Sequence, residues 1–500
     1  MRNYIILFIC LIIIGLQLSS CRKDVVLYDA EINDSLDIPF ILKLNNKICC
    51  YDAESNSLRC TIEESEKEDY NPLVEFQTYA AIQFNGQSLA NNEINHLGTI
   101  KTDTTYNLTI VVNQALNNIS LSFTNLPIVQ IVSPGKIYNQ RKTISKLLIH
   151  YPEQDKASDV HFIGIEHRGF VILKYPKKSY GIELKDLSNV NLNTSRSLLD
   201  IPAANQWVLD PMYLDKGRMR NKVSFDIWNS MNDNADVFIE SEFIELFMNN
   251  QHMGIYTFGN KINDELLNLT DPNGVLYKTA NYDGKTTSFG EYKTTPPNKF
   301  EWDGWVQKYP DPDNKVNWSL LDTLRQLTVN ASDEAFKQTI SSLIDMESFI
   351  DYYILINFLI ADDNTGKNNF LYSLDGEKLT ILPWDLDGAL GRHWNGDKNT
   401  DSKNSIILDN NLFERLISTN ANDFKTALKD RWSSLRSNQY SKANLDLILA
   451  KNFNELNQSN IIDLENKIWD DDINITTEEV YISYWMGERL TFLDSYFEGL

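Results

Sequence analysis

The sequence predicts an α+β protein in which a small N-terminal β-sandwich precedes a larger mixed domain. Apolar and polar residues alternate around Leu108, Ile110 and Val112, which is the pattern of a strand with one buried face. From Ser319 to the C-terminus most apolar residues recur every three or four positions, which indicates helices. A chain of 500 residues is also long for one domain, so we expect two or three.

Residues 21–125 form the predicted sandwich. Short strand-like segments alternate there with Asn, Gly and Asp turns, and no catalytic side chains are grouped among them. We therefore interpret this region as a spacer or an adhesion module. Residues 126–500 form the second domain, with strands up to about residue 280 and mostly helices from residue 319. The segment 281–318 is predicted to be a long loop or insertion.

The N-terminus has the features of a bacterial export signal. Arg2 is followed by an apolar run from Tyr4 to Leu16, which is too short for a comfortable membrane span. The next segment, Leu18-Ser19-Ser20-Cys21, resembles a lipobox, in which the cysteine thiol receives a lipid. We therefore expect residues 1–20 to be a lipoprotein signal peptide and Cys21 to anchor the exported chain to a membrane of the cell envelope, with the outer membrane as the expected location. The alternative is an ordinary secretory signal with a coincidental cysteine.

Charge and cysteine content exclude some functions. The net charge of −23 argues against nucleic acid as the main partner, because a polyanion would be repelled. Export permits disulfides, and either Cys49 or Cys50 could pair with Cys60 across a turn-like segment. These three cysteines have no histidine at metal-binding spacing, so a zinc site is not expected.

The most informative stretch for chemistry lies between residues 345 and 391. Asp345–Ile360 is apolar on nearly all sides, which predicts a buried helix. Asp363 and Asn368 follow it with the D-x-x-x-x-N spacing of the protein-kinase catalytic loop, without the His-Arg that precedes that loop. A strand–turn–strand then leads to Asp385 and Asp387. In phosphoryl transfer one carboxylate accepts the hydroxyl proton, while an amide oxygen and further carboxylates hold divalent metal against the phosphates. Two Asx-rich turns are the alternative explanation.

Other segments extend this pattern over roughly residues 126–500. They are Arg168-Gly169, Pro176 to Leu184, Trp207-Val208-Leu209, Asp215, Arg220-Asn221, Glu245 to Asn250, Gly254-Ile255-Tyr256, Asn368 to Tyr372 and Pro383 to Asp387. With these landmarks the chain resembles the spore coat protein H (CotH) kinase-like family of atypical, secreted protein kinases. The resemblance implies a two-lobed, kinase-like fold and phosphoryl transfer from ATP with a divalent metal, Mg²⁺ or Mn²⁺.

The resemblance also implies roles for single residues. Asp363 would be catalytic, Lys178 would contact phosphates, and Asp385 would bind the metal. The spacing adds Asn368 and Asp387 as further metal ligands.

Two more cations are candidates for the nucleotide site. Lys278 could reach the nucleotide. Arg220 is a further candidate, although we favour a structural role in which it holds a buried carboxylate such as Asp215.

One departure from the family pattern concerns the lysine half of this site. Family members usually carry a Glu where this chain has Asn260, and that Glu can pair with the phosphate-binding lysine. We therefore expect Lys178 to be poorly restrained, unless Glu183, Asp264 or Glu265 substitutes. There is also no Gly-rich phosphate loop.

Three functions follow from these observations. The first is an exported, lipid-anchored, ATP- and metal-dependent kinase that acts on protein hydroxyls. The second is a surface-tethered pseudokinase without catalysis, which binds a nucleotide, a metal or a partner protein. The third is a glycan-binding or adhesion lipoprotein that uses exposed Trp302, Trp305 and Trp318.

Overall fold

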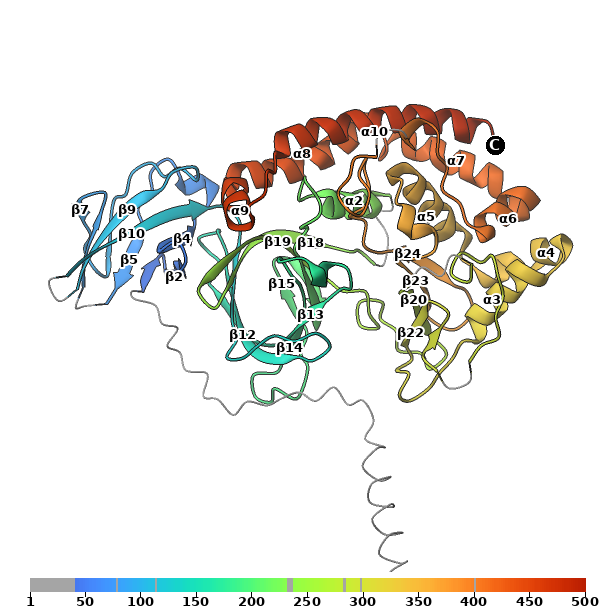
Figure 1. The fold of residues 1–500 in the computed structure, drawn as a ribbon, viewed down its shortest axis with the longest axis horizontal. Coiled ribbons are helices and arrows are strands. Elements are labelled where there is room, and N and C mark those ends of the chain that lie inside the picture. The colour runs from blue at the N-terminus through green and yellow to red at the C-terminus, as the bar shows by residue number, and fades with distance from the viewer. Residues whose placement is uncertain are drawn as a thin grey trace, which may run out of the picture.

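The computed structural model describes residues 41–77, 80–112, 115–231, 237–281, 285–296, 299–399 and 402–500. The predicted signal peptide and the lipidation site at Cys21 lie outside these residues. Within the described parts of the chain, no helix is long and apolar enough to cross a bilayer. Figure 1 shows sheets at the N-terminal end, a barrel in the middle and a mostly helical C-terminal part. The predicted mixed α+β fold is confirmed, whereas its likeness to the two lobes of a protein kinase stays a prediction.

The N-terminal region consists of two sheets packed around one apolar core. The first has the strand order β2-β1-β5-β8 and the second β3-β4-β10-β9-β6-β7. Their strands are β1 (Leu42–Leu44), β2 (Lys47–Ile48), β3 (Cys50–Asp52), β4 (Ser57–Thr61), β5 (Leu73–Phe76), β6 (Ala80–Phe84), β7 (Gln87–Ser88), β8 (Glu93–Ile94), β9 (Tyr106–Val112) and β10 (Ala115–Thr124). Leu108 and Ile110 on β9 and Leu121 on β10 are buried in this core, as their alternation predicts.

A disulfide joins Cys49 to Cys60 in this region, which decides between the two pairings that the sequence leaves open. Cys50 is a free, buried cysteine. It packs with Ile128 and Phe247 of the next domain, so its side chain belongs to an interface rather than to a redox pair.

The central part is a closed seven-stranded barrel with the order β11-β12-β13-β14-β17-β19-β18. The parallel pairing of β11 with β18 closes it, at Ile128 opposite Glu245. Apolar side chains such as Ile163, Trp207 and Phe258 form its buried core. The strands are β11 (Ile128–Val132), β12 (Thr143–His150), β13 (Asp159–Arg168), β14 (Ser179–Lys185), β17 (Gln206–Asp210), β18 (Ser241–Met248) and β19 (Gln251–Asn260), with an added hairpin of β15 (Arg196–Leu198) and β16 (Ile201–Ala204).

The C-terminal part packs helices around a five-stranded sheet of order β21-β22-β20-β23-β24. Its strands are β20 (Val275–Thr279), β21 (Glu301–Trp302), β22 (Trp305–Tyr309), β23 (Asn369–Ser373) and β24 (Thr380–Pro383). Its helices are α3 (Ser319–Asn330), α4 (Asp333–Leu343), α5 (Met346–Leu359), α6 (Asn411–Thr419), α7 (Phe424–Ser437), α8 (Lys442–Ser459), α9 (Ile461–Trp469) and α10 (Ile475–Glu498); α2 (Arg220–Ser230) leaves the barrel after β17. The segment 281–318 therefore contributes the strands β21 and β22, and the prediction of a long loop is wrong for these residues.

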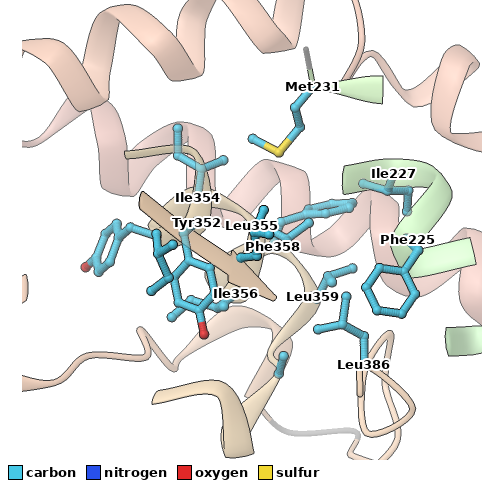
Figure 2. Packing of buried hydrophobic residues seen from close by; sticks show 14 of the residues in the cluster. Phe225, Ile227, Met231, Tyr352, Ile354, Leu355, Ile356, Phe358, Leu359 and Leu386 are labelled. Atoms are coloured by element: carbon cyan, nitrogen blue, oxygen red, sulfur yellow. The ribbon is translucent and has the colours of Figure 1, made fainter. Parts of the chain in front are cut away.

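Helix α5 is the centre of this part. It begins at the cap residue Asp345, whose Oδ1 accepts the N–H of Glu347, and it ends where Ile360 turns left-handed. Most of its side chains are buried, so the predicted buried helix is confirmed. Figure 2 shows Phe225 and Ile227 of α2, and Met231 just after its end, on the side that faces α5.

The three parts of the chain meet at one buried ion pair. Arg59 of β4 donates to Glu245 of β18, with 2.8 Å between Nη2 and Oε1, and both side chains are almost fully buried. The same guanidinium donates to the carbonyl of Ser459 at the end of α8, and His252 Nε2 lies 3.1 Å from Glu245 Oε2. The N-terminal region is thus fixed to the barrel and to α8, which is more than a spacer requires.

Candidate functional site

The predicted carboxylates stand at the end of β24, where the backbone turns sharply. Asp385 has a φ of 56°, in the left-handed region that Asp tolerates better than most residues. Leu386 is buried, whereas Asp385 is exposed and Asp387 is half-buried. Burial raises the pKa of Asp387 well above its ordinary value, and the charges of Asp385 and Asp210 add to that rise. These carboxylates are therefore close enough to repel one another.

Asp210 completes the carboxylate group from the end of β17. Asn221, in the first turn of α2, links it to the turn after β24: its Nδ2 donates to Asp210 Oδ2 at 2.8 Å, and its Oδ1 accepts the N–H of Leu386 at 2.9 Å. Burial raises the pKa of Asp210, and the neighbouring Asp385 charge raises it further. Asp210 directly follows the landmark Trp207-Val208-Leu209, and Asn221 belongs to the landmark Arg220-Asn221, but local spacing indicated no role for either residue.

Two cations lie beside these carboxylates. The Arg168 guanidinium is 5.6 Å from the ring centre of Trp384, and Lys278 Nζ is 5.8 Å from the same ring. Burial lowers the pKa of Lys278 to about 8; Arg168 lowers it further, and Asp385 opposes the fall. Burial also lowers the pKa of Arg168, against the opposing charges of Asp385 and Asp210. Lys278 thus lies beside Asp385, and its role at a nucleotide stays a prediction. Arg168 is a further functional candidate, which the sequence marked only as a landmark without a role.

Asn368 adjoins this group through the loop before β23. It too has a left-handed φ, 55°, and its carbonyl accepts the N–H of Trp384 at 2.8 Å. Asn364 Nδ2 bridges the carbonyls of Asn368 and Trp384, at 2.8 and 3.1 Å. Asn368 Nδ2 lies 3.5 Å from the carbonyl of Asp385. The loop and the end of β24 are therefore bound together, which brings Asn368 and Asp385 into one site.

Asp363 lies at the start of the same loop, in a short 3₁₀ turn, Asp362–Thr365. Its half-buried carboxylate is 3.1 Å from Lys367 Nζ. The preceding Asp362 lies 3.3 Å from His393 Nδ1, in the segment that follows Asp387. Asp363 thus keeps an accessible carboxylate oxygen in the loop that carries Asn368, but no direct contact joins it to Asp385.

The structure does not bring Lys178 to this group. Its Nζ donates to the carbonyl of Leu173 at 2.7 Å and to that of Tyr175, so the ammonium closes its own loop. Its neighbour Lys177 is fully buried and pairs with Glu465 of α9, with 2.6 Å between Nζ and Oε1. Lys177 is therefore an internal structural cation that holds the barrel to α9.

Arg220 is committed to structure, and its assignment as a nucleotide ligand is wrong. Its guanidinium is fully buried and pairs with Asp215 at 2.5 Å and with Glu478 of α10 at 2.7 Å. Its third nitrogen, Nε, faces the carbonyl of Leu390 at 3.4 Å. Each of its three nitrogens thus has a protein partner and the side chain is fully buried, so the favoured structural role is confirmed.

Asn260 does not face Lys178, so the concern about a missing Glu partner is also wrong. Asn260 pairs with Trp207, which pairs with Ile182, four residues along β14 from Lys178. At roughly 3.3 Å per residue, the backbone positions of Lys178 and Asn260 are offset by about 13 Å along the strands. The Asn260 side chain instead donates from Nδ2 to the carbonyl of Phe238 and accepts the N–H of Glu240 at Oδ1.

Two of the three proposed substitutes for that Glu have other partners. Glu183 pairs with Lys142 and Lys185. Glu265 accepts hydrogen bonds from Ser195 and from the N–H of Asn205. Neither carboxylate is therefore available to position Lys178.

The three tryptophans proposed as a glycan surface are buried. Trp302, Trp305 and Trp318 are 2%, 1% and 5% exposed and belong to the main apolar core. A glycan site built on these rings is therefore wrong, because their faces pack against protein.

The carboxylates have the chemistry of a metal site but not a closed one. In the described part of the chain, no three His, Cys, Asp or Glu side chains converge to hold a metal by themselves. Carboxylate and amide oxygens are the ligands that Mg²⁺ and Mn²⁺ favour, and Mg²⁺ usually takes its other ligands from water and phosphates. The mutual repulsion among Asp385, Asp387 and Asp210 is what a divalent cation would relieve.

The geometry of the site indicates a class of chemistry, and comparison with known proteins gives the family. A strand end with carboxylates, an asparagine loop and two adjacent cations is an arrangement suited to phosphoryl-group chemistry. The family model for CotH kinase protein matches residues 165–493, which is more than half of the chain, and the chain belongs to that family. Membership suggests an atypical kinase. No curated protein matches the chain.

Proposed function

We propose that this protein is an exported, lipid-anchored kinase that transfers the γ-phosphoryl group of ATP to a protein hydroxyl with the help of a divalent metal. The observation that carries the proposal is the meeting of Arg168 and Lys278 with Asp385, Asp387 and Asn368 at one end of β24. Cations and carboxylates together can hold a polyphosphate and its metal, which neither group could hold alone.

Each side chain has a distinct task in this proposal. Asp385, Asp387 and the Asn368 amide oxygen would hold Mg²⁺ or Mn²⁺, which would supply charge neutralisation at the phosphates. Lys278 and Arg168 would neutralise and orient the phosphate oxygens. The substrate hydroxyl oxygen bonds to the γ-phosphorus, the bond from phosphorus to the ADP oxygen breaks, and the hydroxyl proton passes to Asp363.

Two lysine-to-methionine variants test the residues that are proposed to bind the phosphates. Lys278→Met should weaken Mg·ATP binding by about 10- to 100-fold, because a charged hydrogen bond contributes roughly 1.5–3 kcal/mol. Lys178→Met is the matched control and should leave binding nearly unchanged, since its ammonium serves backbone carbonyls. Isothermal titration calorimetry measures both. A larger loss in Lys178→Met than in Lys278→Met would contradict the assignment.

The same lysine predicts a pH dependence. Its pKa is lowered to about 8, so Lys278 is charged below that pH and loses its proton as the pH rises through it. ATP binding should therefore weaken between about pH 7 and pH 9 in the wild-type protein. The weakening should be smaller in Lys278→Met. An equal pH dependence in both proteins would show that another group is responsible.

The membrane anchor has its own test. Cys21→Ser should move the protein from the membrane fraction to the soluble fraction, because the thiol is the expected lipid acceptor. Cys10→Ser, inside the apolar run of the signal, is the matched control and should stay with membranes. Fractionation followed by immunoblotting measures both. A Cys21→Ser protein that still sediments fully with membranes would disprove the lipoprotein assignment.

A further inference from the structure

A pocket of about 680 Å³ lies apart from the carboxylate site. The C-terminal end of α2, the first turns of α5, helix α7 and the β23–β24 hairpin surround it. Its volume is in the range of small-molecule sites. Much of its lining is apolar or aromatic, as shown by Trp228, Ile350, Tyr372, Ile381 and Leu382. Such a lining favours an apolar ligand body, because burying it removes apolar surface from water.

The charged side chains around the pocket are not balanced. Asp345, Glu347 and Asp351 line it, with Arg431 as the one cation among the described lining residues. Arg431 is already occupied: its Nε is 2.6 Å from Asp351 Oδ1, and its Nη2 donates to Asp351 Oδ2 and to the carbonyl of Met231. Asp345 Oδ1 accepts the N–H of Glu347, whereas no described residue donates to the Glu347 carboxylate. Among the described residues, Asp345 and Glu347 therefore have no cationic partner, and Glu347 is exposed at the rim of the pocket.

The pKa of the Asp351 carboxyl is consistent with this excess of negative charge. Its pKa is raised, first by burial; Arg431 opposes the rise, and the charges of Glu347 and Asp345 add to it. The three carboxylates thus interact at close range, so a second positive charge would be stabilised there.

We infer that this pocket is a second binding site, for a small molecule that carries a primary ammonium group on an apolar or aromatic body. The ring or chain would occupy the space between Trp228 and Leu382, and the ammonium would face Glu347 and Asp345. This complementarity requires both halves of the ligand: Trp228, Ile350 and Leu382 favour an apolar body, and the nearby carboxylates would repel an anion.

The position of the pocket links it to the carboxylate site. Leu382 precedes Asp385 by three residues on the same strand and turn, and α2 carries Trp228 near its end and Asn221 in its first turn. A ligand that tightens α2 against β24 would act on both partners of Asn221.

Three indole compounds of similar size test the binding site without ATP. Tryptamine carries an ammonium, tryptophol a hydroxyl and indole-3-acetate a carboxylate. Calorimetry on the purified protein should give the order tryptamine, then tryptophol, then indole-3-acetate, from tightest to weakest. Equal affinity for all three, or the tightest binding by indole-3-acetate, would overturn the assigned chemistry.

Variants locate the binding to the pocket. Glu347→Gln should weaken tryptamine about threefold to fivefold, the effect expected of one partly exposed ion pair, and leave tryptophol unchanged. Ala427→Phe, which fills the pocket from α7, should abolish binding of both. The matched controls are Glu334→Gln, in the exposed first turn of α4, and Ala443→Phe, exposed on α8. Tryptamine binding that survives Ala427→Phe or is lost in Ala443→Phe would overturn the location. Because no nucleotide is needed, these results do not depend on the proposed kinase activity.

Discussion

Asp385→Asn is expected to abolish metal-dependent binding of ATP, whereas Asp363→Asn should leave binding intact and remove phosphoryl transfer. Metal ligands are needed whenever the phosphates are bound, but a base is needed only when the acceptor hydroxyl reacts. Loss of the base should lower the transfer rate by about 10² to 10⁴. Calorimetry with Mg·ATP and with Mn·ATP measures binding, and radiolabelled ATP with a protein acceptor measures transfer.

The contrast between the two variants carries the test. Asp430→Asn, exposed on α7, is the control for a change of one surface carboxylate. An equal loss of binding in the Asp363 and Asp385 variants would contradict the division of roles. If neither variant differs from Asp430→Asn, the loop and the strand end are ordinary Asx turns and the kinase proposal fails. Binding without transfer in the wild-type protein would identify a nucleotide-binding pseudokinase.

Glu245→Gln should cost about 3–5 kcal/mol of unfolding free energy, because it leaves the buried Arg59 charge without its partner. Denaturant titration of the purified protein measures this loss. Replacing both residues by Met should recover most of it, since two buried charges are then removed together. Glu68→Gln, exposed in the N-terminal region, is the control. A cost below about 1 kcal/mol for Glu245→Gln would show that the pair does not hold the three parts together.

The same pair predicts acid sensitivity. Burial would raise the pKa of Glu245, but Arg59 and His252 outweigh it and lower the value from 4.5 to about 2. A carboxyl with a depressed pKa stabilises the fold fully above its unfolded pKa and loses that contribution as the pH falls through the folded one. As the pH falls from about 4.5 to about 2, the wild-type protein should therefore lose stability relative to the double Met variant. A chain that starts near Pro127 should be destabilised for the same reason, because it lacks Arg59.

Local patterns allowed part of this fold to be predicted. Alternation located the strands around residues 108–123, and all-round apolarity located α5, because both depend on near neighbours in the sequence. The spacing of Asp363, Asn368 and the two later aspartates also depends on one loop and one hairpin. Closure of the barrel could not be predicted, since β11 and β18 pair across more than a hundred residues.

The charged partners were harder to predict for the same physical reason. The local sequence around a lysine that precedes a strand is the same whether its side chain is solvated or buried. Lys177 is buried because it pairs with Glu465, which lies 288 residues away. Arg168, Asp210 and Asn221 each lie far in sequence from Asp385, and no local spacing connects them. The prediction for Asn260 was wrong because the family pattern pairs this position with the phosphate-binding lysine. The strand register places Asn260 opposite Trp207 instead, away from Lys178.

The meeting of Arg59 with the end of α8 constrains how the chain can fold. Arg59 donates to the carbonyl of Ser459, 400 residues later in the chain, and Lys177 forms its ion pair with Glu465 of α9. Contacts of such long sequence separation form late, because the intervening loop must first be closed. The barrel can gather its strands early, but Lys177 and the Arg59 guanidinium gain their last partners only when α8 and α9, in the last sixth of the chain, are in place. A nascent or truncated chain that lacks α8 and α9 would hold these charges in a half-built interface, so quality-control proteases should distinguish it from the finished protein.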